Sequence, residues 1–394
     1  MINYTEARTM MRAKAHSFGT EMIPLDQAYG RVLTGTVRAD RDYPPFDRAT
    51  MDGYALRTAD LQQGLHEFNI IETIFAGDTA SRQLSPGECY KIMTGASVPP
   101  DANIVIRRED TEEGELSIRL RVDTIRPFLN IARQGEDMRT GDTVIDSPCM
   151  AEPAIIGLLA SLGQKDVTVA RLPRVALITT GNEVVSVDTP PGPTQIRNSN
   201  RWLLQAFLKK WQIEPSSCQH APDDRAHLRT AIEKALSADV VILCGGVSAG
   251  DADHVPEMLT AAGVTRLFHK LAIKPGKPVW CGSGPGDTMV FALPGNPFSC
   301  LVGFILLIQP YLQACFGLPE NAPMSLPLAT AKKKYTPLDE FFPVRLHGAP
   351  VRLVPVSLNG SGDIRLGMQA NALALHPAGM PELEEGTNLS YFPL

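Results

Sequence analysis

Paired cysteines, clustered histidines and an excess of basic residues are all missing from this 394-residue chain. Its seven cysteines stand apart and no CxxC occurs, which argues against a disulfide framework and against a cysteine zinc site. None of the eight histidines has the spacing of a metal-ligand pair. With 37 basic and 43 acidic residues the net charge is −6, which argues against sequence-independent binding to nucleic acid.

A secretory signal and a membrane span are also absent from the pattern. The first ten residues, MINYTEARTM, lack the apolar core of a signal peptide. The most apolar stretch, 298–316, is interrupted by Gln309, Pro310 and Gln313, so we expect a buried core helix there. Scattered, reduced cysteines are typical of the cytosol, and we expect a cytoplasmic protein.

The length of the chain and the order of its helix and strand signals predict a multidomain protein of class α/β plus β. Helical patterns at 5–17 and 151–163 flank a stretch, 52–137, of short strand-like pieces separated by glycine and proline. Strands then alternate with helices from Pro173, and the pattern becomes β again after Pro323. We expect four domains: a discontinuous N-terminal domain (1–43 with 138–172), an inserted β-rich domain (44–137), an α/β domain with a parallel-rich sheet (173–322) and a small C-terminal β-barrel (323–394).

Three glycine-rich turns, each directly after an apolar run, are the most informative feature of the chain. They are TTGNE (179–183), GGVSAGDAD (245–253) and PGNP (294–297), after runs at 175–178, 240–243 and 289–293. Continuous apolar runs predict strands covered on both faces, and the loops at their carboxyl ends should meet at one crevice. Glycine lets backbone N–H groups approach an anion, so turns that also carry acids indicate a phosphate ligand with a divalent metal.

The acids in these turns have alternative interpretations. Glu183 could cap the next segment or hold a metal, and the short motif does not decide between them. The second turn is more specific, because it combines three glycines, a serine and two acids within nine residues. Asp253 is the better candidate there for metal or anhydride chemistry, whereas capping is enough to explain Asp251.

The second turn also matches GxSxG, the nucleophile-elbow pattern of hydrolases, at 246–250. A catalytic triad would explain only Ser248. An anion-cradling loop would explain Ser248 together with both acids, and we therefore favour the loop.

Lysines are concentrated in one further segment, where Lys270, Lys274 and Lys277 lie within eight residues among Ala, Ile, Pro and Gly. Partly pinned ammonium groups beside an acidic loop suit a polyanionic ligand. By contrast, we expect 332–334 (KKK) to be a solvated linker or strand edge. The PGNP turn restricts φ before the apolar helix and offers Asn296 as a donor or acceptor.

In the N-terminal half, Asp52 stands in an Asp-Gly pair that is also a common hairpin turn. Thr94 in MTGA and Asp137 in GED are equally ambiguous when taken alone.

Seven motifs occur in one order over residues 44–297: PPFDRATMDGYALR, KIMTGASVP, QGEDM, TTGNEV, GGVSAGDADHV, KLAIKPGKP and LPGNP. This ordered set resembles the molybdopterin molybdenumtransferase family, of the MoeA and gephyrin E-domain type. The resemblance implies an elongated homodimer of four domains, whose MogA-like α/β domain binds adenylylated molybdopterin. It implies insertion of molybdate and cleavage of the adenylyl anhydride to AMP with the help of Mg2+.

The resemblance also implies roles for single residues. The catalytic set would be Asp52, Asp137, Glu183, Asp253, Lys270 and Lys274, and the Mg2+ ligands Glu183, Asp223 and Asp253. The substrate would be held by Thr94, Gly245, Gly246, Ser248, Gly250, Lys277, Pro294, Gly295, Asn296 and Pro297. The pocket would lie between the α/β domain of one subunit and the N-terminal domains of the other. A molybdopterin adenylyltransferase and apo-molybdoenzymes would be its protein partners.

The chain departs from the family pattern at a few positions. Arg48-Ala49-Thr50 stands where Asn-Ser-Ala is usual, Asn182 where Asp is usual, and Ala132 where arginine is common. The lost serine and arginine favour a second hypothesis, a divergent paralogue that carries molybdopterin without inserting the metal. A third, a molybdopterin adenylyltransferase, shares the α/β domain but not the long N-terminal half and the β tail. The sequence does not distinguish molybdate from tungstate as the oxyanion.

Overall fold

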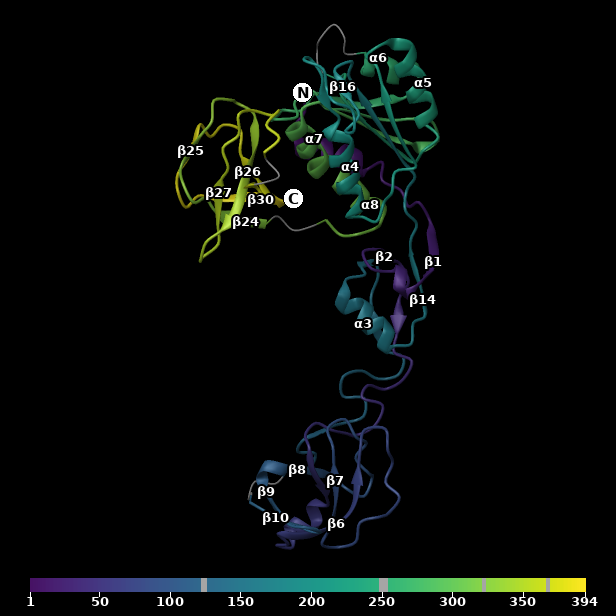
Figure 1. The fold of residues 1–394 in the computed structure, drawn as a ribbon, viewed down its shortest axis with the longest axis vertical. Helices are drawn as coiled ribbons and strands as arrows, with labels where there is room; N and C mark the ends of the chain where they lie inside the picture. Colours follow the sequence, from purple (N-terminus) through teal and green to yellow (C-terminus); the bar gives the residue numbers. More distant parts are fainter. Residues whose placement is uncertain (122–125, 248–253, 321–323, 366–368) are drawn as a thin grey trace. The chain divides into compact units, whose positions relative to one another are not determined.

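The computed structural model describes residues 1–121, 126–247, 254–320, 324–365 and 369–394, which form two compact units (Figure 1). One unit comprises Met1–Thr34, Pro148–Glu152 and Val167–Leu394. The other comprises Gly35–Ser147 and Pro153–Asp166. The second unit is thus inserted into the first in sequence.

A six-stranded sheet, in the order β8-β5-β7-β6-β10-β9, forms the centre of the inserted unit. Its strands are β5 (Gly53–Leu56), β6 (Glu67–Ile74), β7 (Glu88–Ile92), β8 (Ile104–Arg107), β9 (Thr111–Glu113) and β10 (Ser117–Leu120). Successive residues of β5 face opposite sides, because Tyr54 and Leu56 belong to one apolar cluster and Ala55 to the other. The unit also contains helices α2 (Thr58–Gln62) and α3 (Pro153–Ser161).

Short strand pairs complete this unit. They are β3 (Val37–Arg38) with β12 (Thr143–Ile145), and β4 (Arg48–Ala49) with β11 (Ile131–Ala132). The hairpin interpretation of Asp52-Gly53 is not confirmed, because β4 pairs with β11 whereas β5 pairs with β7 and β8. Gly53 is needed for another reason: a Cβ there would lie 2.0 Å from the carbonyl oxygen of Ile106.

The chain's first segments belong to the larger unit. Helix α1 (Tyr4–Arg12) is capped by Asn3, whose side chain accepts from the N–H of Glu6 at 2.7 Å, and it buries Ala7 and Met11. It ends earlier than the pattern at 5–17 predicts. A four-stranded sheet then combines β1 (Thr20–Pro24), β14 (Asp166–Ala170), β2 (Val32–Leu33) and β13 (Cys149–Met150), in that order.

A mixed six-stranded sheet, in the order β18-β15-β19-β23-β22-β20, carries the three turns. Its strands are β15 (Val175–Thr180), β18 (Ser217–Ala221), β19 (Val240–Cys244), β20 (Thr265–His269), β22 (Trp280–Ser283) and β23 (Met289–Leu293). The first four strands in the order are parallel, whereas β22 and β20 run antiparallel to their neighbours. Every residue of β15, β19 and β23 is buried, as the apolar runs predict.

Helices cover both faces of this sheet (Figure 1). Helix α4 (Ser199–Lys209) and the long helix formed by α7 (Pro297–Gly303), a π-helical turn (Phe304–Ile308) and α8 (Gln309–Cys315) pack against Leu177 and Ile242. On the other face, α5 (Arg225–Ala235) and α6 (Val255–Ala261) pack against Ile178 and Leu243. The helix Pro297–Cys315 is long and apolar enough to cross a membrane, but 89% of its apolar window is buried in the protein. The prediction of a core helix is thereby confirmed.

The C-terminal strands form a sheet in the order β21-β26-β28-β30-β24, with β27 paired to β26. They are β21 (Ile273–Lys274), β24 (Met324–Pro327), β26 (Asp339–His347), β27 (Arg352–Pro355), β28 (Ala372–His376) and β30 (Asn388–Pro393). A bridge between Leu328 and Leu353 also brings the end of β24 to β27. Strand β21 comes from the lysine-rich segment and pairs with β26, so this segment joins the α/β part to the C-terminal sheet.

The expectation of a solvated linker or strand edge at 332–334 is confirmed for the strand edge and is wrong for the solvation of Lys334. Lys332–Lys333 form strand β25, which pairs with β29 (Glu382–Leu383). Lys334 is 7% exposed, and its ammonium group donates to the carbonyl oxygens of Leu338, His376 and Pro377. Three carbonyl acceptors compensate for the loss of water around the buried charge.

Candidate active site

The first and third glycine-rich turns and residues 245–247 of the second line one cleft at the carboxyl ends of β15, β19 and β23. The cleft has a volume of about 1640 Å³ and is lined on one side by these turns and by α4 residues 199 and 200. Segment 273–278 and C-terminal residues at 338, 340–343, 355–358 and 360–362 are also among the lining residues. Segments distant in sequence therefore share one cavity, as the parallel arrangement of the strands predicts.

Ten of the site residues predicted from sequence line this cleft. They are Glu183, Asp223, Gly245, Gly246, Lys274, Lys277, Pro294, Gly295, Asn296 and Pro297. Lys270 is not among the lining residues; it directly follows β20 and has a positive φ of 68°. Ser248, Gly250, Asp251 and Asp253 lie outside the described residues. Asp52, Thr94 and Asp137 belong to the other compact unit.

Close backbone approach explains the two glycines at the end of β19. Gly245 has a φ of 108°, and a Cβ there would lie 2.5 Å from Thr180 Oγ1 and 2.9 Å from the Thr180 carbonyl oxygen. Gly246 has a φ of 65°, and its Cβ would lie 2.8 Å from Val255. A larger residue would displace β15 at the first position and the start of α6 at the second, so only glycine fits this junction.

The second and third turns touch each other. The N–H of Gly245 donates to the carbonyl oxygen of Leu293 at 3.0 Å, and a Cβ on Gly295 would lie 3.7 Å from Gly245 Cα. Beneath them, the Cys244 thiol donates to the carbonyl oxygen of Pro294 at 3.4 Å. The contact of Cys300 with Cys244, together with burial, raises the pKa of the Cys300 thiol well above its usual value. Cys300 therefore stays protonated at neutral pH.

Two carboxylates stand at the first turn. A carboxylate oxygen of Glu183 lies 2.9 Å from where a Cβ on Gly181 would be, so this side chain folds back over the turn. Asp223 is tied to the same turn by two bonds, since it accepts from the N–H of Asn182 at 3.3 Å and its own N–H donates to Asn182 Oδ1 at 3.2 Å. Both acids line the cleft.

The donor set at this corner fits a hard divalent cation in part. Carboxylate oxygens suit Mg2+, which is commonly held by one or two carboxylates together with substrate phosphates. Within the described ranges, no group of three or more His, Cys, Asp or Glu residues could hold a metal ion. Asp253, the third predicted ligand, lies outside those ranges.

Cationic side chains supply the opposite charge. Lys274 and Lys277 are exposed to the cleft, and neither forms an ion pair within the described part of the chain. Lys332 also lines the cleft, but its ammonium group lies 2.8 Å from the Glu340 carboxylate and over the Phe342 ring at 4.6 Å. Lys274 and Lys277 are therefore available to an anionic ligand, as is Arg197, which also lines the cleft, is exposed and forms no ion pair among the described residues.

Sequence reasoning missed several polar residues of the cleft. Thr180 Oγ1 and Asn200 Oδ1 are buried and have no hydrogen-bond partner among the described residues. The Asn200 amide group donates to the carbonyl oxygen of Gly295 at 2.6 Å, which links α4 to the PGNP turn. The signal that could have found Asn200 is the polar run 198–200, which caps and begins the amphipathic helix α4.

In the other unit, Thr94 holds Asp52. The backbone N–H and the hydroxyl of Thr94 both donate to one Asp52 oxygen, and these bonds keep the pKa of Asp52 below its usual value of 3.8. Asp137 is exposed, and its backbone N–H donates to the carbonyl oxygen of Tyr43 at 3.0 Å. Both acids are thus fixed in turns of this unit.

Comparison with known proteins covers most of the chain. The family description "MoeA N-terminal region (domain I and II)" matches residues 2–163, and "Probable molybdopterin binding domain" matches residues 176–314. Proteins named molybdopterin molybdenumtransferase are similar to this chain. The one from Staphylococcus epidermidis is 32% identical over 92% of this chain and 88% of its own length. The one from Synechocystis is 32% identical over 92% of each chain.

Solved structures agree with this relationship. A crystal structure of the molybdopterin biosynthesis MoeA protein from Pyrococcus horikoshii OT3 covers 100% of both chains with a TM-score of 0.86 and 28% identity. Another structure of the Pyrococcus horikoshii MoeA protein gives a TM-score of 0.79 at 30% identity, over 100% of this chain. Sequence, fold and cleft therefore agree, and the chain belongs to the molybdopterin molybdenumtransferase (MoeA) family.

Proposed function

We propose that the cleft at the ends of β15, β19 and β23 binds adenylylated molybdopterin. As a member of its family, the chain is a transferase that inserts molybdate into molybdopterin during molybdenum cofactor biosynthesis. The observation that carries the proposal for the cleft is the convergence of glycine turns, two acids and two lysines on one cavity. Such a cavity suits a ligand with a pyrophosphate and a large planar ring.

We propose Glu183 and Asp223, together with Asp253, as the residues that hold Mg2+. A bound divalent cation would neutralise charge on the adenylyl anhydride while AMP leaves. Lys274 and Lys277 would bind the phosphate oxygens, and Gly245, Gly246 and the PGNP turn would let the ligand approach the backbone. For Ser248, Gly250 and Lys270 the resemblance alone supports a role.

For Asp52, Asp137 and Thr94 we propose a role in handling molybdate. In a homodimer, the inserted unit of one subunit would complete the cleft of the other, as the resemblance implies. The elongated form, the four-domain division with a C-terminal β-barrel, and a cytoplasmic location belong to the same proposal. So do contacts with a molybdopterin adenylyltransferase and with apo-molybdoenzymes.

The experiment that tests this function measures AMP release. Purified protein is given adenylylated molybdopterin, molybdate and Mg2+, and AMP is quantified over time. We expect molybdate-dependent AMP release in the parent protein and none in Asp253→Ala, whose fold should survive because the sequence predicts a glycine-rich loop at this position. Bound pterin without AMP release in the parent would contradict the transferase mechanism.

Two alanines support the alternative function, a carrier that binds molybdopterin without inserting the metal. Ala49 and Ala132, which replace polar residues of the family, are 1% and 7% exposed, and neither offers a polar side chain for an oxyanion. A carrier would bind the pterin tightly, release no AMP and remain associated with a molybdoenzyme in a pull-down. The AMP assay therefore separates the two functions.

A further inference from the structure

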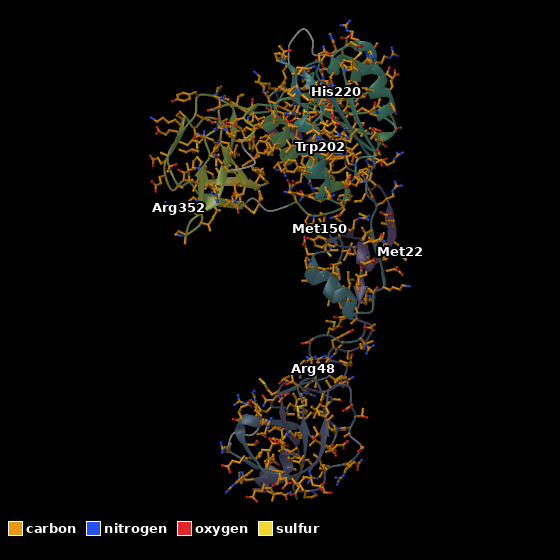
Figure 2. The ribbon with its side chains drawn as sticks, in the orientation of Figure 1. Met22, Arg48, Met150, Trp202, His220 and Arg352 are labelled. Atoms are coloured by element: carbon orange, nitrogen blue, oxygen red, sulfur yellow. The ribbon has the colours of Figure 1, made fainter. Side chains whose placement is uncertain are left out.

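His220 touches the first turn of the cleft at two places, although no sequence motif pointed to it. It lies on β18, the strand next to β15 in the sheet. Figure 2 labels this residue. One ring nitrogen, Nδ1, lies 3.1 Å from Thr179 Oγ1, and the other, Nε2, lies 3.1 Å from the carbonyl oxygen of Gly181. The imidazole thus spans the residues on either side of Thr180.

The partners of the ring determine where its proton lies. A carbonyl oxygen can only accept, so Nε2 carries the hydrogen and donates to Gly181. Asn198 Oδ1 accepts from the N–H of Arg201 at 3.1 Å, so its amide group is the donor to Thr179 Oγ1 at 2.7 Å. The Thr179 hydroxyl then has two acceptors within reach, Nδ1 of the ring at 3.1 Å and the carbonyl oxygen of Gln219 at 3.4 Å, and the shorter contact is the one to the ring. The result is a directed chain from Asn198 through Thr179 and His220 to Gly181.

This series of hydrogen bonds ends at the Gly181–Asn182 peptide, which is bonded at both its carbonyl and its N–H. The carbonyl of Gly181 and the N–H of Asn182 belong to the same planar peptide, and they point in opposite directions. His220 binds the carbonyl at 3.1 Å, while Asp223 accepts from the N–H at 3.3 Å. Gly181 has a φ of 135°, and its carbonyl oxygen also accepts from the backbone N–H of Val184 at 3.2 Å, so the His220 ring adds a second bond to a carbonyl that the turn already holds. Fixing this peptide fixes the position of Asp223 relative to Glu183.

We infer that His220 is a positioning residue, which orients the Gly181–Asn182 peptide so that Glu183 and Asp223 present their carboxylates to one divalent cation. This inference rests on the proposed function of the cleft. His220 itself touches neither the cation nor the substrate, because its ring nitrogens are both engaged with the turn. Partners that orient metal ligands typically change metal affinity by 10- to 100-fold when removed.

The test measures Mn2+ binding to the full-length protein with AMP present, by the electron paramagnetic resonance signal of free Mn2+. We expect His220→Ala to weaken Mn2+ binding about tenfold. His220→Gln places an amide N–H near the position of Nε2, so it should restore most of the affinity. His347→Ala, at an exposed histidine on β26, is the matched control and should leave binding unchanged.

Each result decides a separate question. Parent-like Mn2+ affinity in His220→Ala would overturn the positioning role, and so would a His220→Gln variant as weak as His220→Ala. AMP affinity without metal and the thermal melting curve should stay at the parent values in all three variants. If the parent protein itself fails to bind Mn2+, the proposed metal site is wrong, and the inference fails with it.

Discussion

The backbone N–H and the hydroxyl of Thr94 donate to the same oxygen of Asp52, each at 2.7 Å. The two residues meet because Gly53, at the start of β5, pairs with Ile92, at the end of β7. The Thr94 hydroxyl proton is therefore committed to a carboxylate. In the proposed site, Thr94 would hold Asp52 in its ionised form. Its hydroxyl proton would then not be available to an oxyanion.

We expect Thr94→Val to raise the pKa of Asp52 towards 3.8, because one of the two bonds that lower it is lost. Thr94→Ser, which keeps the hydroxyl, should leave the pKa at the parent value. A carboxyl titration by nuclear magnetic resonance measures both. An unchanged Asp52 pKa in the valine variant would show that the backbone bond is sufficient.

The lowered pKa of Asp52 also makes the free energy of unfolding depend on pH. Because the folded-state pKa lies below the unfolded value, the contribution to the free energy of unfolding is present above about pH 3.8 and is lost as the pH falls through the folded-state pKa. Asp52→Asn should therefore reduce stability at neutral pH but not below the folded-state pKa. Denaturant unfolding at several pH values would reveal this convergence.

Lys274 should contribute to nucleotide binding through charge. We expect Lys274→Ala to weaken AMP binding about fivefold at low salt, and the difference from the parent should shrink as salt rises. Lys234→Ala, at an exposed lysine of α5 outside the cleft, should have no effect. Calorimetric titration at two salt concentrations tests both variants, and equal affinities at low salt would place Lys274 away from the phosphates.

Alanine variants of Gly245 and Gly360 would distinguish the cost of backbone strain from the cost of a steric clash. Their φ values are 108° and 103°, but a Cβ on Gly245 would strike Thr180 whereas one on Gly360 would meet nothing within 4 Å. Gly360→Ala should cost about 1–3 kcal/mol through φ alone, and Gly245→Ala a further 1–3 kcal/mol through the clash. Free energies of unfolding measure the difference. Equal costs would mean that the turn relaxes around the added methyl group.

Arg48 stands opposite Ala132 in the antiparallel pair of β4 and β11. Its exposed side chain forms no ion pair within the described residues, so its guanidinium group is free to bind an anion at the edge where the family commonly has an arginine. We expect Arg48→Gln to raise the molybdate concentration for half-maximal AMP release about tenfold. Arg119→Gln, at another exposed arginine of this unit, is the control; an unchanged molybdate dependence in Arg48→Gln would exclude the role.

Much of the site could be predicted because its signals are local. Strands buried on both faces must be apolar throughout, so the runs before the three turns identify β15, β19 and β23 directly. A glycine in the sequence also marks a position where the backbone can adopt a positive φ, as Gly245 and Gly246 do. The shared cleft follows from the rule that parallel strands end at one edge.

Other features depended on which strands become neighbours. Lys270 and Lys274 look equivalent in sequence, but only Lys274 lies on β21, and only it lines the cleft. Lys334 looks solvated until β28 brings the carbonyl oxygen of His376 to its ammonium group. His220 looks unremarkable until β18 pairs with β15 and sets its ring against the first turn.

The amino-acid sequence by itself determined the family, the buried strands and the chemical types in the turns, because each of these is set by residues close together in the chain. Only the tertiary structure decided which lysines line the cleft, which histidine contacts the first turn and which polar atoms of the described residues lack partners. These depend on strand order and register, where a shift of one residue turns a side chain to the opposite face.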